Sequence, residues 1–226
     1  MSNTALIQVL GAVAYGELKA HEGARAEAEA TADEVERRRL RKVAAEELRH
    51  HKGFVARLEA MGADPDRAMQ PYHRVLDRYH SNEAPDPITE AVQGYLGEGI
   101  ADDLLTWLRQ VVDADTAAFI DTVIEDEVEH EAAATRQLRA LLDADPEGAH
   151  KAARGARRMF LNMARSGGAG GAPLVAFLRL GKTPQLLDAV FGGMARRLSA
   201  IDVDPLRLPG PLRRAVRAHL SRPAAV

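Results

Sequence analysis

The sequence of 226 residues contains no cysteine. This absence excludes disulfide bonds, iron–sulfur clusters, thiolate zinc sites and cysteine nucleophiles, so a transition metal would have to be bound through nitrogen and oxygen. Aromatic residues make up only 4% of the chain, and no apolar run approaches the roughly 18 residues of a membrane-spanning helix. The first residues, Met1 to Leu10, carry no basic stretch ahead of an apolar block. We therefore expect a cytoplasmic protein without a secretory signal or a membrane partner.

β-Branched residues are also scarce, with 16 Val and 6 Ile against 41 Ala and 25 Leu. Strands favour β-branched side chains, whereas Ala and Leu are strong helix formers, so the composition predicts an all-α protein. The formal net charge of −3 is unevenly distributed. Residues 1–149 contain 16 basic and 30 acidic residues, and residues 150–226 contain 14 basic and 3 acidic residues. An acidic body is therefore followed by a basic C-terminal section.

Helical periodicity, capping residues and helix breakers predict four long helices, over about 4–30, 31–61, 86–112 and 113–145. The second helix is predicted to begin at a capping box of Thr31 and Glu34, and the third at Asp86 followed by Pro87. A stretch over about 64–85 connects them and is predicted to contain a short crossing helix. Four long helices with one longer crossover describe a ferritin-like four-helix bundle.

The basic section is predicted to form a C-terminal helical extension. We expect its helices over about 147–165, 183–200 and 209–221, with a flexible glycine-rich break over 167–171. The predicted domain organisation is a four-helix bundle at 1–145, followed by the basic helical section at 146–226, packed on the bundle or appended to it.

Two of the long helices carry the same short motif, an acidic residue followed by Glu-x-x-His. The first copy contains Glu47 and His50, and the second contains Glu127 and His130, with the histidines 80 residues apart. A Glu and a His three residues apart lie on one helix face, about one turn apart, so both can bind the same metal ion.

A lone glutamate on a face of small or apolar residues precedes each motif. Glu17 lies 30 residues before Glu47, and Glu98 lies 29 residues before Glu127. In an antiparallel helical hairpin this separation places each lone glutamate level with its motif. The pattern predicts that four carboxylates and two imidazoles converge inside the bundle around a pseudo-twofold axis. Buried carboxylates are costly unless cations neutralise them, so we expect a site for two metal ions.

The donor set indicates which metals the site would take and what each ligand would do. Mixed carboxylate and imidazole ligation suits iron, or manganese as the alternative, better than copper or structural zinc. We expect Glu47 and Glu127 to bridge the metals. The terminal ligands would be Glu17, His50, Glu98 and His130.

Several residues near the ligands are candidates for orienting them, with helix-surface or structural roles as the alternative: Glu46, Asp126, Asp102, His21 and Tyr95. For Tyr95 the alternative is a buried structural tyrosine, and for His21 a solvated or hydrogen-bonded histidine. We assign three further residues to solvent: His51, Glu129 and Glu131.

Four runs of the sequence resemble a known family: Val13–Leu18, Ala44–His50, Leu58–Met69 and Tyr95–Asp102. They are similar to the actinobacterial ferritin-like proteins grouped with the tRNA methylthio-isopentenyl-adenosine hydroxylase, the MiaE-like branch. The resemblance extends over about residues 5–200. It implies two iron ions held by the six ligands above. It also implies a monooxygenase that uses O₂ and an external electron donor to hydroxylate a modified tRNA adenosine or another small organic substrate.

The residues themselves leave other functions open. The same ligands would serve iron oxidation or storage without an organic substrate, a peroxidase or a manganese catalase, and a bundle could keep its ligands as a binding module. Storage usually needs a large hollow assembly, whereas we expect a monomer or a homodimer.

The basic section also has two interpretations. Arginines on its helices could contact tRNA phosphates: Arg154, Arg157, Arg158, Arg213, Arg214 and Arg217. Alternatively, the section docks on the acidic bundle or on a second subunit, which its few aromatic residues favour, because RNA binding commonly uses aromatic stacking.

Overall fold

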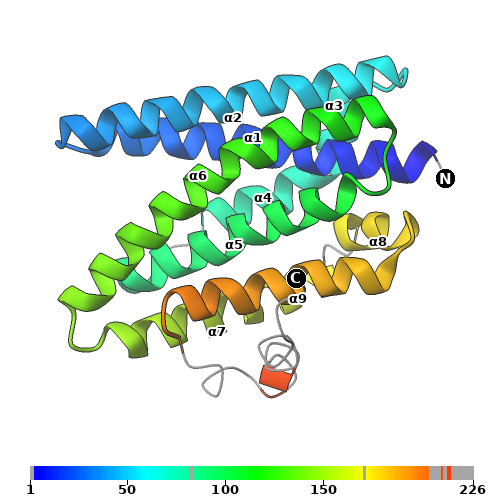
Figure 1. The fold of residues 1–226 in the computed structure, drawn as a ribbon. Coiled ribbons are helices and arrows are strands. Elements are labelled where there is room, and N and C mark those ends of the chain that lie inside the picture. Colours follow the sequence, from blue (N-terminus) through cyan, green and yellow to red (C-terminus); the bar gives the residue numbers. More distant parts are fainter. Residues whose placement is uncertain (1–2, 82–83, 170–171, 204–209, 211–212, 215–226) are drawn as a thin grey trace. The chain divides into compact units, whose positions relative to one another are not determined.

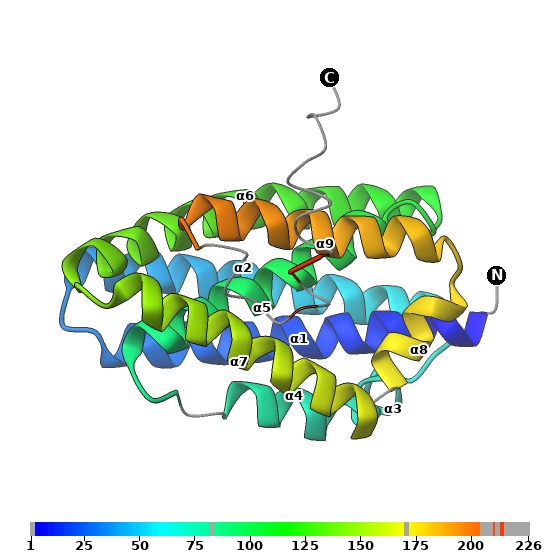
Figure 2. The same ribbon diagram turned by 90° about the horizontal axis from the view of Figure 1, so that it is seen from below.

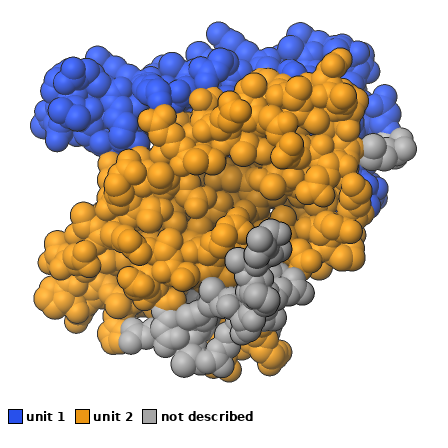
Figure 3. Space-filling model, in the orientation of Figure 1, with its two compact units in different colours: residues 1–82, 166–181 blue, residues 83–165, 182–226 orange. Residues whose placement is uncertain are grey.

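The computed structural model describes residues 3–81, 84–169, 172–203, 210 and 213–214. Within these ranges the chain forms helices joined by short turns and contains no β-strand, which confirms the predicted all-α class. None of the described helices is long and apolar enough to span a membrane. The chain divides into two compact units, which Figure 3 shows in different colours. The first unit comprises Met1–Asn82 with Ser166–Gly181, and the second comprises Glu83–Arg165 with Lys182–Val226.

The first unit is built on a hairpin of two long helices, α1 (Asn3–Ala30) and α2 (Glu34–Ala60). The two helices lie side by side in both views (Figure 1, Figure 2). Three short helices and a 3₁₀ turn complete the unit: α3 (Pro65–Met69), η1 (Gln70–Tyr72), α4 (His73–His80) and α8 (Ala172–Arg179). A Cβ on Gly11 would lie 2.3 Å from the carbonyl oxygen of Ala68, so glycine at this position lets α3 approach α1.

The start of α2 differs from the prediction. The helix begins at Glu34, and the Asp33 carboxylate caps it by accepting hydrogen bonds from the amides of Val35 and Glu36 at 2.8 and 3.2 Å. The predicted capping box of Thr31 and Glu34 is therefore wrong. The Thr31 hydroxyl instead accepts a hydrogen bond from the Asp33 amide at 3.3 Å. The crossing helix predicted between 64 and 85 is present as α3, η1 and α4.

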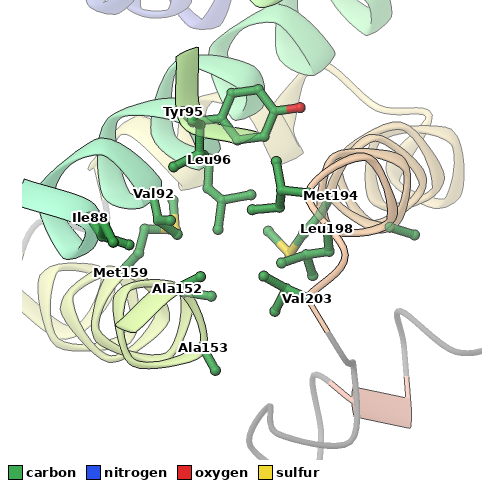
Figure 4. Close-up of a cluster of buried hydrophobic side chains, with 14 residues drawn as sticks. Ile88, Val92, Tyr95, Leu96, Ala152, Ala153, Met159, Met194, Leu198 and Val203 are labelled. Carbon is green, nitrogen blue, oxygen red and sulfur yellow. The ribbon is translucent and has the colours of Figure 1, made fainter. Parts of the chain in front are cut away.

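The second unit contains α5 (Pro87–Leu108), α6 (Ala114–Ala144), most of α7 (Gly148–Ala169) and α9 (Thr183–Ala200). Side chains from all four helices form its apolar core, which Figure 4 shows in part. The most deeply buried members include Val92 and Leu96 of α5, Ala152 of α7 and Leu198 of α9. As predicted, Asp86 caps α5 ahead of Pro87, and Asp113, at the expected start of the fourth long helix, caps α6.

The C-terminal section is helical where it is described. The predicted helices over 147–165 and 183–200 are present as α7 and α9. α7 continues through Ala169, so the predicted break at 167–171 does not begin at Gly167, and residues 170–171 lie outside the described residues. Most of the predicted helix over 209–221 also lies outside them. The division at residue 145 stays a prediction; α8 belongs to the first compact unit, and α9 to the second.

Candidate metal centre

Three buried side chains of the first unit bring their ligand atoms together: Glu17 of α1, and Glu47 and His50 of α2. One ligand atom of each lies within 4.8 Å of the others. His50 Nδ1 lies 3.4 Å from Glu17 Oε2 and 3.5 Å from Glu47 Oε2. The exposed fractions of the three residues are 9%, 6% and 1%. Carboxylates held this close in a buried place repel one another, so a cation bound between them is favoured. We call these three residues the first half-site.

Two histidines join α1 to α2 on either side of the first half-site. His21 Nδ1 of α1 lies 2.6 Å from the Ala44 carbonyl oxygen, and His51 Nδ1 of α2 lies 2.7 Å from that of Ala14. A carbonyl oxygen only accepts, so each Nδ1 carries a proton and donates it. Residues 14 and 21 flank Glu17 on α1, and residues 44 and 51 flank Glu47 and His50 on α2. The two hydrogen bonds therefore fix the antiparallel register that places Glu17 beside these two residues. His21 is thus the hydrogen-bonded histidine that the sequence left as an alternative, and the assignment of His51 to solvent is wrong.

The second unit contains the other copy of the motif, on α6. His130 Nδ1 lies 3.3 Å from Glu127 Oε2, close to the 3.5 Å between the corresponding atoms of His50 and Glu47. The Glu127 and His130 side chains are 14% and 15% exposed. Each motif therefore holds its imidazole against its glutamate, as the spacing predicts. We call Glu127 and His130, together with Glu98, the third ligand that the sequence predicts for this unit, the second half-site.

The carboxylates on α5 differ in their surroundings. Glu98 is exposed, whereas the sequence predicts an interior position. Asp102, one turn further along, is half-buried. Burial and the neighbouring charges of Glu127 and Glu98 raise the pKa of Asp102 well above its ordinary value. These three carboxylates therefore share one region of the second unit.

The match to a known family follows this geometry. The family model of the ferritin-like domain of actinomycetes matches residues 2–166. The chain belongs to this family. Membership confirms the predicted ferritin-like fold, and the buried carboxylates and imidazole of the first half-site fit the metal-binding role expected of such a domain. No curated protein matches the chain.

The residues expected to orient the ligands occupy varied places in this ferritin-like protein. Glu46 is buried, with its carboxylate 3.4 Å from Lys42 Nζ, and Asp126 is half-buried on α6. Tyr95 lies in the apolar core of the second unit (Figure 4), and its hydroxyl is hydrogen-bonded to that of Thr135 at 2.9 Å. The orienting roles stay predictions, although the surroundings of Tyr95 match the structural alternative.

The basic section pairs several of its charges with acids of the second unit. Lys151 forms an ion pair with Asp145, and an Arg154 nitrogen lies 3.9 Å from the Asp86 carboxylate. The other arginines considered for RNA differ in exposure: Arg157 and Arg214 are exposed, Arg158 and Arg213 are half-buried, and Arg217 lies outside the described residues.

Arg197 of α9 is a buried residue that no pattern in the sequence singles out. It is 3% exposed and lies 2.7 Å from the Glu131 carboxylate, so the assignment of Glu131 to solvent is wrong. The burial of Arg197 and of Glu131 depends on their pairing between two helices. In the sequence alone, an arginine in a basic section resembles a surface residue.

Proposed function

We propose that this ferritin-like protein is a di-iron monooxygenase that hydroxylates an organic substrate with O₂. The supporting observation is that the two Glu-x-x-His motifs have nearly the same internal geometry, with His–Glu distances of 3.5 and 3.3 Å, while His50 of the first also lies 3.4 Å from the buried carboxylate of Glu17. In this proposal the residues of both half-sites would hold two metal ions, and Glu47 and Glu127 would be the ligands that the ions share. Glu98 is exposed, so its proposed ligand role rests on the sequence repeat.

The donor chemistry of the half-sites fits iron. The ligands are carboxylate oxygens and imidazole nitrogens, a set that suits iron or manganese, and the chain has no thiolate to offer a softer metal. Iron, when bound, would supply the reduction of O₂ with two electrons from an external donor. The chain supplies the ligands, holds each imidazole one turn from its glutamate and keeps bulk water away from Glu17, Glu47 and His50 by burial.

The substrate class is proposed from the sequence resemblance to the MiaE-like branch, which points to a modified tRNA adenosine. Among the arginines considered for RNA that the structure describes, exposed Arg157 and Arg214 are the better suited to phosphate contacts. Lys151 and Arg154 already face acids of the same unit, so their contribution to RNA binding would be smaller.

The decisive test is a single-turnover oxygenation. The iron-loaded, chemically reduced protein is mixed with isotope-labelled O₂ and with tRNA from cells that lack the gene. Nucleosides are then analysed by mass spectrometry. We expect one labelled oxygen atom in a modified adenosine, with the second oxygen atom released as water. The Glu47→Ala variant should give no product, whereas Glu59→Ala, which changes an exposed glutamate of the same helix, should react like the unaltered protein.

Other outcomes would contradict the proposal in distinct ways. O₂ consumption that yields only ferric mineral, in a large hollow assembly, would indicate iron storage. Manganese in the isolated protein together with rapid disproportionation of hydrogen peroxide would indicate a catalase. Labelled product on a small molecule, with none on tRNA, would keep the monooxygenase and replace its substrate.

A further inference from the structure

One arginine of α9 sits among three carboxylates of α5 and α6. Arg197 Nη1 lies 2.8 Å from Asp103 Oδ2, and Nε and Nη2 lie 2.9 and 2.7 Å from Glu131 Oε2. Nη2 is also 3.6 Å from Asp102 Oδ2. Arg197 and Asp103 are each 3% exposed. A guanidinium presents five donors in a planar fork, so it can bridge several carboxylates at once.

Two glycines provide the space for this arrangement. A Cβ on Gly99 of α5 would lie 2.0 Å from Arg197 Nε, and a Cβ on Gly193 of α9 would lie 2.0 Å from both carboxylate oxygens of Asp103. Any larger residue at either position would collide with the ion pair. The buried charges are therefore built into the packing of α9 against α5.

The arginine is connected to the second half-site through Asp102. The Asp102 carboxylate experiences the charges of Glu127 and Glu98, the two glutamates of that half-site, as well as the charge of Arg197. Glu131, a further partner of Arg197, directly follows His130 on α6. Without a cation in this place, the acids of α5 and α6 would repel one another.

We propose that Arg197 is a positioning residue of the second half-site. By bridging Asp102 and Asp103 of α5 to Glu131 of α6, it holds the two helices in the arrangement in which the half-site binds a metal ion. The inference rests on the proposed function, since it needs a metal at that half-site. α9 lies outside the residues 2–166 that the family model matches, so the C-terminal section of this chain supplies part of the metal centre's support.

The test compares metal binding by the full-length Arg197→Gln variant with that of Arg196→Gln. Arg196 is the matched control because its side chain is 71% exposed on the same helix and lies 3.5 Å from Asp103. Ferrous iron is titrated into each protein without oxygen, metal content is measured after desalting, and Mössbauer spectra are recorded. We expect Arg197→Gln to bind the second equivalent at least about tenfold more weakly, the loss typical when a residue supporting a ligand is changed. Binding of the first equivalent should be affected less, because Glu17, Glu47 and His50 are unaltered. Its spectrum should lose the signal of the second iron, and Arg196→Gln should match the unaltered protein.

The Arg197→Lys variant keeps the inference testable if Arg197→Gln does not fold. Lysine keeps the charge and loses the planar fork, so it should also weaken the second equivalent. Unchanged binding of both equivalents and an unchanged spectrum in the folded variants would overturn the positioning role, and so would an equal weakening of both equivalents. An unaltered protein that binds fewer than two ions would instead contradict the proposed function itself, and the positioning role would fall with it.

Discussion

Gly193 of α9 faces the carboxylate of Asp103 so closely that a Cβ on residue 193 would lie 2.0 Å from either oxygen. Gly193→Ala should therefore displace Asp103 from Arg197, its partner at 2.8 Å. We expect a loss of about 3 kcal/mol in the free energy of unfolding, because a buried charge pair is broken and the core is overpacked. Urea denaturation measures this change.

Gly94 provides the control for that substitution. A Cβ on Gly94, in the interior of α5, would have no heavy atom within 4 Å. Gly94→Ala should raise the free energy of unfolding by roughly 0.5–1 kcal/mol, because alanine restricts the unfolded chain. Similar effects at both positions would show that Gly193 does not make room for the ion pair.

His51→Ala should weaken the contact between α1 and α2 beside the first half-site. It removes the donor to the Ala14 carbonyl, at 2.7 Å, and leaves that acceptor without its partner from the histidine. We expect a loss of about 1–2 kcal/mol, with faster amide hydrogen exchange in the middle of α1. His150→Ala, at an exposed position of α7, should have little effect on either measurement.

Asp33→Ala tests which residue caps α2. The Asp33 carboxylate accepts from two amides of the first turn, whereas the Thr31 hydroxyl accepts from the Asp33 amide alone. Asp33→Ala should cost about 1 kcal/mol in thermal or chemical unfolding, the usual value for loss of an N-cap. Thr31→Ala should cost distinctly less, and the reverse order would restore the capping box that the sequence predicts.

Local patterns predicted the helices and the proximity of Glu17, Glu47 and His50. The caps at Asp86 and Asp113 depend on residues within one turn, so they can be read directly from the sequence. The meeting of Glu17 with Glu47 and His50 follows from helix periodicity and from the length of one hairpin. The prediction failed at the start of α2, where two potential caps lie two residues apart and only the backbone path decides between them.

The surroundings of the second half-site could not be predicted in the same way. Arg197 and Asp103 are separated by 94 residues, and their pairing depends on how α9 packs against α5. A charged residue is assigned to solvent unless a partner from another helix is known, which explains the errors at Glu131 and His51. The exposure of Glu98 likewise depends on how α5 is rotated about its axis within the second unit. The spacing of 29 residues between Glu98 and Glu127 does not determine this rotation.

The Asp113 cap of α6 should make stability depend on pH. Hydrogen bonds from the amide and hydroxyl of Thr116, at 3.0 and 2.8 Å, lower the pKa of Asp113. An aspartate with a lowered pKa stabilises the fold above the unfolded-state pKa of about 4, and this contribution is lost as the pH falls through the folded-state pKa. Asparagine caps a helix about as well but does not titrate, and Asp113 is exposed to screening by solvent. Asp113→Asn should therefore be less stable by roughly 0.3 kcal/mol at neutral pH. The difference should vanish in acid, and a constant difference at every pH would contradict the assignment.

Removal of Glu47 tests the metal centre through stability. A metal ion that binds the folded chain alone adds about 2.7 kcal/mol to the free energy of unfolding when its free concentration is 100 times the dissociation constant. Glu47 is 6% exposed and lies 3.5 Å from His50, so Glu47→Ala should lower the metal content and abolish most of this added stability. For the unaltered protein and for the exposed-site control Glu59→Ala, the unfolding temperature should be higher with iron than with a chelator. For Glu47→Ala the two unfolding temperatures should be nearly equal. Unchanged metal stoichiometry together with unchanged stabilisation by iron in Glu47→Ala would contradict its proposed role as a ligand.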